Sequence, residues 1–113
     1  MTVEQYFETG AAFERPIFEA VAQHLESVGP ITIEPLSVGI MFKRARTFAE
    51  LRPKRDRVEL SFMLSRPLEN PRISRTWKGT GERRAFFIKI REASEVDAEL
   101  RDWLTESYLQ SPE

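Results

Sequence analysis

The sequence predicts an α+β fold, a two-layer sandwich in which an antiparallel sheet of about four strands is covered on one face by N-terminal and C-terminal helices. Two observations support this prediction. Apolar residues recur at three- and four-residue spacing near both ends of the chain, and they alternate with polar residues in the middle. The 113 residues contain no internal repeat and no linker. We therefore expect residues 1–113 to form a single domain.

Two helices are expected before the sheet. Thr2 and Gln5 have the spacing of a capping box, which predicts a short first helix. A second helix is predicted over residues 16–28, because Pro16 suits a first helical turn and Gly29 ends the apolar pattern. The apolar stripe of this second helix comprises Ile17, Phe18, Val21, Ala22, Leu25 and Val28.

The middle of the chain has the two-residue period of β-strands. The clearest strand surrounds Leu60, and shorter ones are expected near Ile40 and from Thr47 to Arg52. Residues 65–76, which contain two prolines and an asparagine, are predicted to form an ordered loop. A last hairpin is expected from Trp77-Lys78 and from Arg84 to Arg91, around the Gly-Thr-Gly sequence of residues 79–81.

A final helix is predicted over residues 95–109, with Ser94 as its N-cap and several acids in its first turns. Its apolar stripe indicates that it packs on the sheet. The predicted core comprises Phe18, Val21, Leu25, Phe42, Val58, Leu60, Phe62, Phe86, Ile88, Leu100, Trp103 and Leu104.

Charge is segregated along the chain. Fifteen of the 17 Lys and Arg residues lie between Lys43 and Arg91, together with only five acids, whereas the flanking segments hold thirteen acids and two bases. Eleven of the fifteen are Arg, which suits bidentate contacts with carboxylates or phosphates. The basic window predicts either a surface for an anionic partner or a set of ion pairs with the acidic last helix.

The leading hypothesis is a small, non-enzymatic, cytoplasmic binding domain that uses an Arg-rich sheet edge and loop. Its anionic partner would be a nucleic acid or an acidic protein surface. We expect a monomer or a weak homodimer. The candidate binding residues are Lys43, Arg44, Arg46, Arg55, Arg75 and Trp77. Phe87 alternates with cations and is a further aromatic that could stack a base, unless it belongs to a second small core under the N-terminal segment.

The alternative function is an enzyme or small-molecule module, with a pocket between the sheet and the N-terminal segment lined by Glu50 and Trp77. Glu50 and Glu59 could act together as paired carboxylates, but cross-strand ion pairs with neighbouring cations are the favoured interpretation. No serine has a histidine to activate it, so no catalytic residues are assigned.

Several classes of site are excluded by composition. The chain has no Cys and one His, so thiolate chemistry is absent and a zinc site is not expected. His24 is interpreted as a half-buried packing residue. No cofactor is expected, and no segment approaches the ~20 apolar residues of a transmembrane helix.

The segment from Phe42 to Leu51, with the sequence FKRARTFAEL, is the most specific part of a resemblance that covers nearly the whole chain. Tyr6-Phe7, Trp77 and the Gly-Thr-Gly turn add to it. On these residues the chain resembles a bacterial family of domains of unknown function, of the DUF5655 type, whose members sometimes carry the label "predicted transport protein". The resemblance implies an α+β fold and no established activity. The absence of a spanning segment gives the transport label no support.

Overall fold

The computed structural model describes residues 1–8 and 12–112 of the chain. Three α-helices, six strands and one 3-10 helix follow one another within these residues. In chain order they are α1 (Val3–Phe7), α2 (Glu14–Val28), β1 (Thr32–Leu36), β2 (Gly39–Lys43), β3 (Thr47–Pro53), β4 (Val58–Leu64), β5 (Ile73–Lys78), β6 (Arg84–Ile90), the 3-10 helix η1 (Ala93–Glu95) and α3 (Ala98–Gln110).

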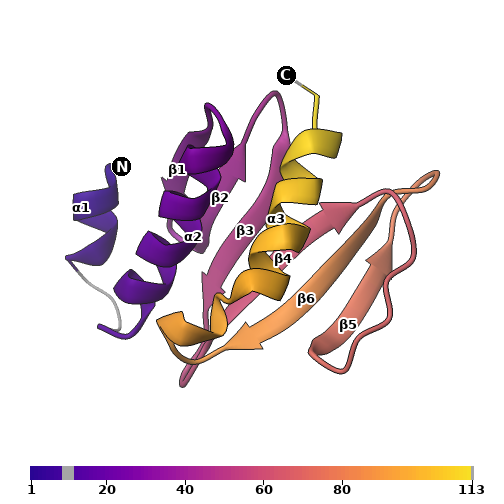
Figure 1. Cartoon of the computed structure of the whole chain (residues 1–113). Coiled ribbons are helices and arrows are strands. Elements are labelled where there is room, and N and C mark those ends of the chain that lie inside the picture. The colour runs from indigo at the N-terminus through magenta and orange to yellow at the C-terminus, as the bar shows by residue number, and fades with distance from the viewer. Residues whose placement is uncertain (9–11, 113) are drawn as a thin grey trace.

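All six strands form one antiparallel sheet in the order β1-β2-β3-β4-β6-β5. The helices lie on one face of this sheet, with α1 beside β1 and α3 over β3 and β4 (Figure 1). The α+β prediction is confirmed, but the sheet has two more strands than the four expected. Because the helices cover one face only, the opposite face of the sheet is left open. The edge strand β5 is also open, since no helix lies over it (Figure 1).

The first four residues of β5 lie in the segment that was predicted to be a loop, residues 65–76, and its last two belong to the predicted hairpin. Ile73 is the only half-buried residue of this strand, and the other five are exposed. The regular alternation that marks a strand in a sequence is therefore missing, and a register shift between Ile73 and Arg75 disturbs it further. Pairing with β6 forms the strand, and this pairing leaves no alternation of apolar and polar residues in the sequence of β5 itself.

The core lies between the sheet and the helices, as predicted. All twelve predicted core residues are buried. Phe62 is at its centre, with ring centroids 5.8 Å from both Phe86 and Trp103. Such aromatic pairs contribute about 0.5–1.5 kcal/mol beyond the burial of their area. They fix α3 over β4 and β6.

The helix ends combine one confirmed prediction and one correction. Thr2 and Gln5 form the expected capping box at the start of α1. Ser94 does not cap α3, because Asp97 takes that position and its carboxylate accepts a 3.1 Å hydrogen bond from the backbone N–H of Leu100. Ser94 lies in η1 instead. Aspartate caps as well as serine, so capping preference alone could not separate the two positions.

A buried carboxyl group joins the first two helices. The Tyr6 hydroxyl donates a 2.8 Å hydrogen bond to Oε2 of Glu14, which is 1% exposed at the first turn of α2. Burial raises the pKa of the Glu14 carboxyl above its ordinary value, and the hydrogen bond from Tyr6 partly opposes this shift. The pair belongs to the helix-covered side of the molecule.

Candidate binding surface on the open sheet face

Strand register places two rows of side chains on the open face. In one row, Glu50 of β3 pairs with Ser61 of β4, which pairs with Phe87 of β6. In the next row, Met63 of β4 pairs with Ala85, which pairs with Trp77. Because paired residues of neighbouring strands point to the same face, each row alternates large and small side chains across the sheet.

The small side chains create a hollow. Ser61 and Ala85 lie on adjacent strands, and both are flanked by larger residues of their own rows. The resulting cavity has a volume of about 290 Å³, close to the lower limit of ~300 Å³ for small-molecule sites. Its lining residues are Thr47, Phe48, Ala49, Glu50, Ser61, Met63, Trp77, Ala85 and Phe87.

Trp77 forms the outer wall of the hollow and is 59% exposed. Among the described residues, it is the only aromatic that is exposed to this degree. The indole lies against Gly79, where an added Cβ would come within 2.9 Å of Cζ3 of Trp77. The absence of a side chain at Gly79 therefore permits this position of the indole ring.

A chain of three residues supports the inner wall. The guanidinium of Arg75 lies 4.0 Å from the centroid of the Phe87 ring. Its Nη2 is 3.3 Å from Oε1 of Glu59, whose side chain is only 12% exposed. A cation over an aromatic face contributes about 0.5–1 kcal/mol at exposed sites. Arg75 is thus held over Phe87 by Glu59.

Three cations lie close in the chain to lining residues of the hollow, although Lys78 pairs with Arg84 and its side chain leaves the edge strand on the face opposite Trp77. Arg46 precedes Thr47, Lys78 follows Trp77, and Arg83 is two residues before Ala85. Their side chains form no hydrogen bond or ion pair with any described residue. We call Arg46, Lys78 and Arg83 the rim cations. They are free to contact an anion.

Other arginines of the basic window are bound to α3. Nε and Nη2 of Arg66 donate to the two carboxylate oxygens of Glu106 at 2.6 and 2.8 Å. This bidentate geometry is the strong form of the ion pair. The hydrogen bond from Arg66 holds the pKa of Glu106 below its ordinary value.

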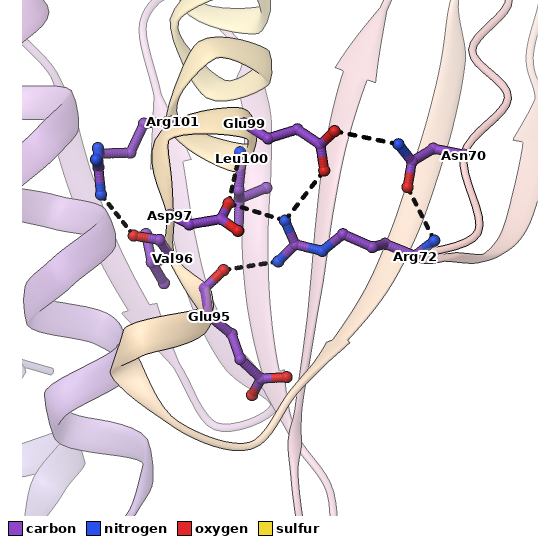
Figure 2. A network of polar contacts seen from close by, with 8 residues as sticks. All are labelled: Asn70, Arg72, Glu95, Val96, Asp97, Glu99, Leu100 and Arg101. Carbon is purple, nitrogen blue, oxygen red and sulfur yellow. Dashed lines mark hydrogen bonds and ion pairs between the residues drawn. The ribbon is translucent and has the colours of Figure 1, made fainter.

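Arg72 binds the first turn of α3 (Figure 2). Its Nη1 donates to Asp97 at 2.8 Å and to Glu99 at 3.4 Å, and its Nη2 donates to the backbone carbonyl of Glu95 at 2.6 Å. Asn70 joins the network through Glu99 and through the backbone N–H of Arg72. The hydrogen bond from Leu100 and that from Arg72 lower the pKa of Asp97.

Arg44 binds the other end of α3. Its Nη1 donates to the carbonyls of Tyr108 and Ser111 at 3.0 and 3.1 Å. The guanidinium also lies 4.2 Å from the centroid of the Tyr108 ring. A cation suits the negative end of the helix dipole. We call Arg44, Arg66 and Arg72 the helix-bound arginines.

The six predicted binding residues therefore do not form one surface. Trp77 lines the hollow, Arg46 precedes the lining residue Thr47, and Arg75 lies over Phe87 on the inner wall. Arg44 is committed to α3, and Lys43 pairs with Glu34 at 3.7 Å. Arg55 lies in the turn between β3 and β4, separated from Arg46 by the whole of β3, or about 20 Å. The predicted basic loop is largely neutralised, because Arg66 and Arg72 bind acids of α3.

Sequence reasoning missed the rim cations Lys78 and Arg83 and the lining residues Ser61, Met63 and Ala85. Lys78 and Arg83 belonged to the basic window but were not distinguished from its other members. The pairing of β4 with β6 and of β6 with β5 brings these residues together, and two of the three strands are not neighbours in sequence. The sequence did contain a signal for the hollow, namely small residues between larger ones on the polar face of a strand.

Two expectations about the open face need correction. Glu50 and Trp77 do line a cavity together, but it lies on the face opposite the helices and not between the sheet and the N-terminal segment. Phe87 does not join a second core under that segment, because α1 packs on the other face. Glu50 and Glu59 form ion pairs, as favoured, although with Arg52 of the same strand and with Arg75 of β5.

The remaining candidates have structural roles. His24 is half-buried on α2, with Nε2 2.8 Å from Oγ1 of Thr105 on α3, and burial lowers its pKa. Gly81 has φ +68° in the turn between β5 and β6, where glycine is favoured. The described residues contain no group of three or more potential metal ligands. Within the same residues, no helix has the length and apolar character needed to cross a membrane.

The geometry defines a small α+β domain whose antiparallel sheet has one face covered by helices and one face open. The chain belongs to DUF5655, described as a domain of unknown function, whose family model matches residues 3–111. Comparison with curated proteins and with solved structures gave no significant match. The description of the family assigns no activity, so any proposal about function must come from the surface itself.

Proposed function

We propose that this domain binds single-stranded nucleic acid on the open face of its sheet. The observation that carries the proposal is the exposed Trp77 at a hollow whose rim cations have no partner within the described residues. Proteins that bind single strands combine stacking aromatics with a positively charged path for the backbone. Here Trp77 would stack a base while the rim cations contact phosphates on either side of it.

Charge distribution across the sheet supports an anionic partner at this position. Residues 1–38, which end with the edge strand β1, hold six acids and one base. Residues 72–91, which form β5 and β6 at the other edge, hold seven bases and one acid. The sheet order places these segments at opposite edges. A polyanion would therefore be attracted to the edge that carries Trp77.

Single strands fit the surface better than a duplex does. A stacked base must be unpaired so that its face can reach Trp77. The hollow is closed at its base by the sheet and is too small for a helix or a strand of another protein. An acidic protein is the other kind of partner for free cations, and it would leave the exposed indole without a stacking role.

The test is fluorescence anisotropy of a labelled oligothymidine of about 10 nucleotides in about 50 mM salt. Three phosphate contacts predict a slope near −2 for log K against log salt, from ~0.7 per contact. Trp77→Ala should lose about 1–3 kcal/mol of binding free energy. The triple variant Arg46→Glu, Lys78→Glu, Arg83→Glu should abolish binding.

The matched control is the double variant Lys54→Glu, Arg55→Glu. These two cations are also without partners within the described residues, but they lie in the turn at the far end of β3. Binding that falls equally in this control would indicate nonspecific attraction. No binding of the oligonucleotide by the wild-type domain, or equal competition by polyglutamate, would reject the nucleic-acid proposal and favour an acidic protein.

A further inference from the structure

The two sides of the hollow differ in chemistry. Trp77 and Phe87, on β5 and β6, provide aromatic walls, whereas Thr47, Glu50 and Ser61, on β3 and β4, provide polar groups. A flat ring system that stacks on Trp77 would point an edge toward β3 and β4. The groups that meet this edge are one carboxylate and two hydroxyls.

The Glu50 carboxylate determines which edge of a stacked ring system can bind in the hollow. Glu50 is partly buried, with a side chain 22% exposed, and Oε1 is 3.3 Å from Nε of Arg52. An ionised carboxylate only accepts hydrogen bonds, and its two oxygens can accept a pair of parallel N–H groups. A hydroxyl can donate to a carbonyl oxygen beside them. The favoured ligand therefore has two adjacent N–H donors and a neighbouring carbonyl.

Among the nucleobases, guanine alone has this arrangement on its pairing edge. N1–H and the N2 amino group are adjacent donors, and O6 is an acceptor. Thymine and uracil offer one N–H between two carbonyls, one of which would face the carboxylate. Adenine and cytosine each offer an amino group beside a ring nitrogen that is itself an acceptor. Only guanine can satisfy both oxygens of Glu50.

We propose that the hollow is a guanine-selective base site, in which Trp77 stacks the base and Glu50 accepts from its N1–H and N2 amino groups. This inference rests on the proposed binding of single strands and adds a specificity to it. Ser61 and Thr47 donate to O6. Arg75 remains over Phe87 and keeps the inner wall in place.

The test compares oligothymidines of about 10 nucleotides with one central residue replaced by guanine, inosine, adenine or cytosine. The guanine strand should bind at least about fivefold more tightly than the all-thymine strand, in keeping with ~1–3 kcal/mol for a bidentate base contact. The inosine strand lacks the N2 amino group, so its affinity should lie between those of the guanine and thymine strands.

Glu50→Gln should remove the guanine preference, measured as the ratio of the affinities for the guanine and all-thymine strands, because the amide presents only one acceptor and its N–H groups can donate to a thymine carbonyl. The matched control is Glu34→Gln. Glu34 lies on the same face, two strands away, and does not line the hollow. This control should keep the full preference.

The outcomes separate the two proposals. If all strands bind with equal affinity, or if the guanine preference survives Glu50→Gln, the base specificity is wrong and the binding of single strands stands. If no strand binds to the wild-type domain, both proposals are overturned. Circular dichroism of each variant checks that the fold is retained.

Discussion

Arg44 and Arg46 lie two residues apart in the connection between β2 and β3, yet they have opposite roles. Arg44 donates to two carbonyls at the end of α3 and covers the ring of Tyr108. Arg46 is exposed, and its side chain makes no hydrogen bond or ion pair with a described residue. The Arg44 side chain therefore reaches the helix-covered side of the sheet, whereas Arg46 has no such anchor among the described residues. Other cations of the basic window differ in the same way: some are bound to α3, and others have no partner among the described residues.

A high density of cations in the sequence therefore does not tell how many of them can contact a binding partner. The helix-bound arginines join the two layers of the fold through contacts with α3, whereas the rim cations have no hydrogen bond or ion pair with a described residue. Arg72 and Arg75 repeat this contrast on either side of the start of β5, one on an acidic turn and the other on an aromatic ring. The contrast between the two faces can be tested directly.

The largest difference between the faces should appear in the core. Leu60 is fully buried toward the helices, so Leu60→Ala should lower the free energy of unfolding by about 2–5 kcal/mol. Trp77→Ala removes a larger side chain from the open face and should cost less than about 1 kcal/mol. Urea denaturation measures both. Similar losses would mean that the open face contributes to the core.

The next largest difference in stability should appear between variants of Arg44 and Arg46, in the connection between β2 and β3. Arg44→Ala should cost about 1–2 kcal/mol, because it removes hydrogen bonds to two helix carbonyls and a cation–π contact. Arg46→Ala should change stability by no more than about 0.5 kcal/mol. Thermal unfolding of the two single variants provides the comparison. A stabilising role for Arg46 would remove it from the rim cations.

The smallest effect concerns Glu14 on the helix-covered side. Its raised pKa means that the folded chain binds a proton more tightly there than the unfolded chain. The contribution of this group to stability is therefore complete below the ordinary carboxyl range and is lost as pH rises through the folded pKa. Glu14→Gln keeps an acceptor for Tyr6, so it should become progressively more stable than the wild type as pH rises from about 4 to 7.

Tyr6→Phe is the control for this pH dependence. It removes a hydrogen bond that opposes the rise in the Glu14 pKa, so the wild-type loss of stability with pH should become steeper. Denaturation midpoints across the pH range measure both variants. A Glu14→Gln variant that loses stability relative to the wild type as pH rises would contradict the assignment of a raised pKa.

Much of the fold could be predicted from the sequence. The period of the apolar residues gave α2, β4, β6 and the core, and the capping box gave α1, because these signals depend only on residues close together in the chain. Most of the strand β5, from Ile73 to Thr76, could not be predicted in this way. It is an edge strand with almost no buried face, and its pairing with β6 determines its conformation.

The sequence alone shows which residue types are available for the candidate site, but not where in the fold they come together. It showed that most of the cations, together with the aromatics Trp77 and Phe87, lie between residues 43 and 91. Folding brings Arg44, Arg66 and Arg72 onto α3, and it leaves Arg46, Lys78 and Arg83 without a hydrogen bond or ion pair to any described residue. The physical reason is that a charge is neutralised by whatever lies within a few ångströms of it, and for these residues those neighbours are up to 67 positions away in the chain.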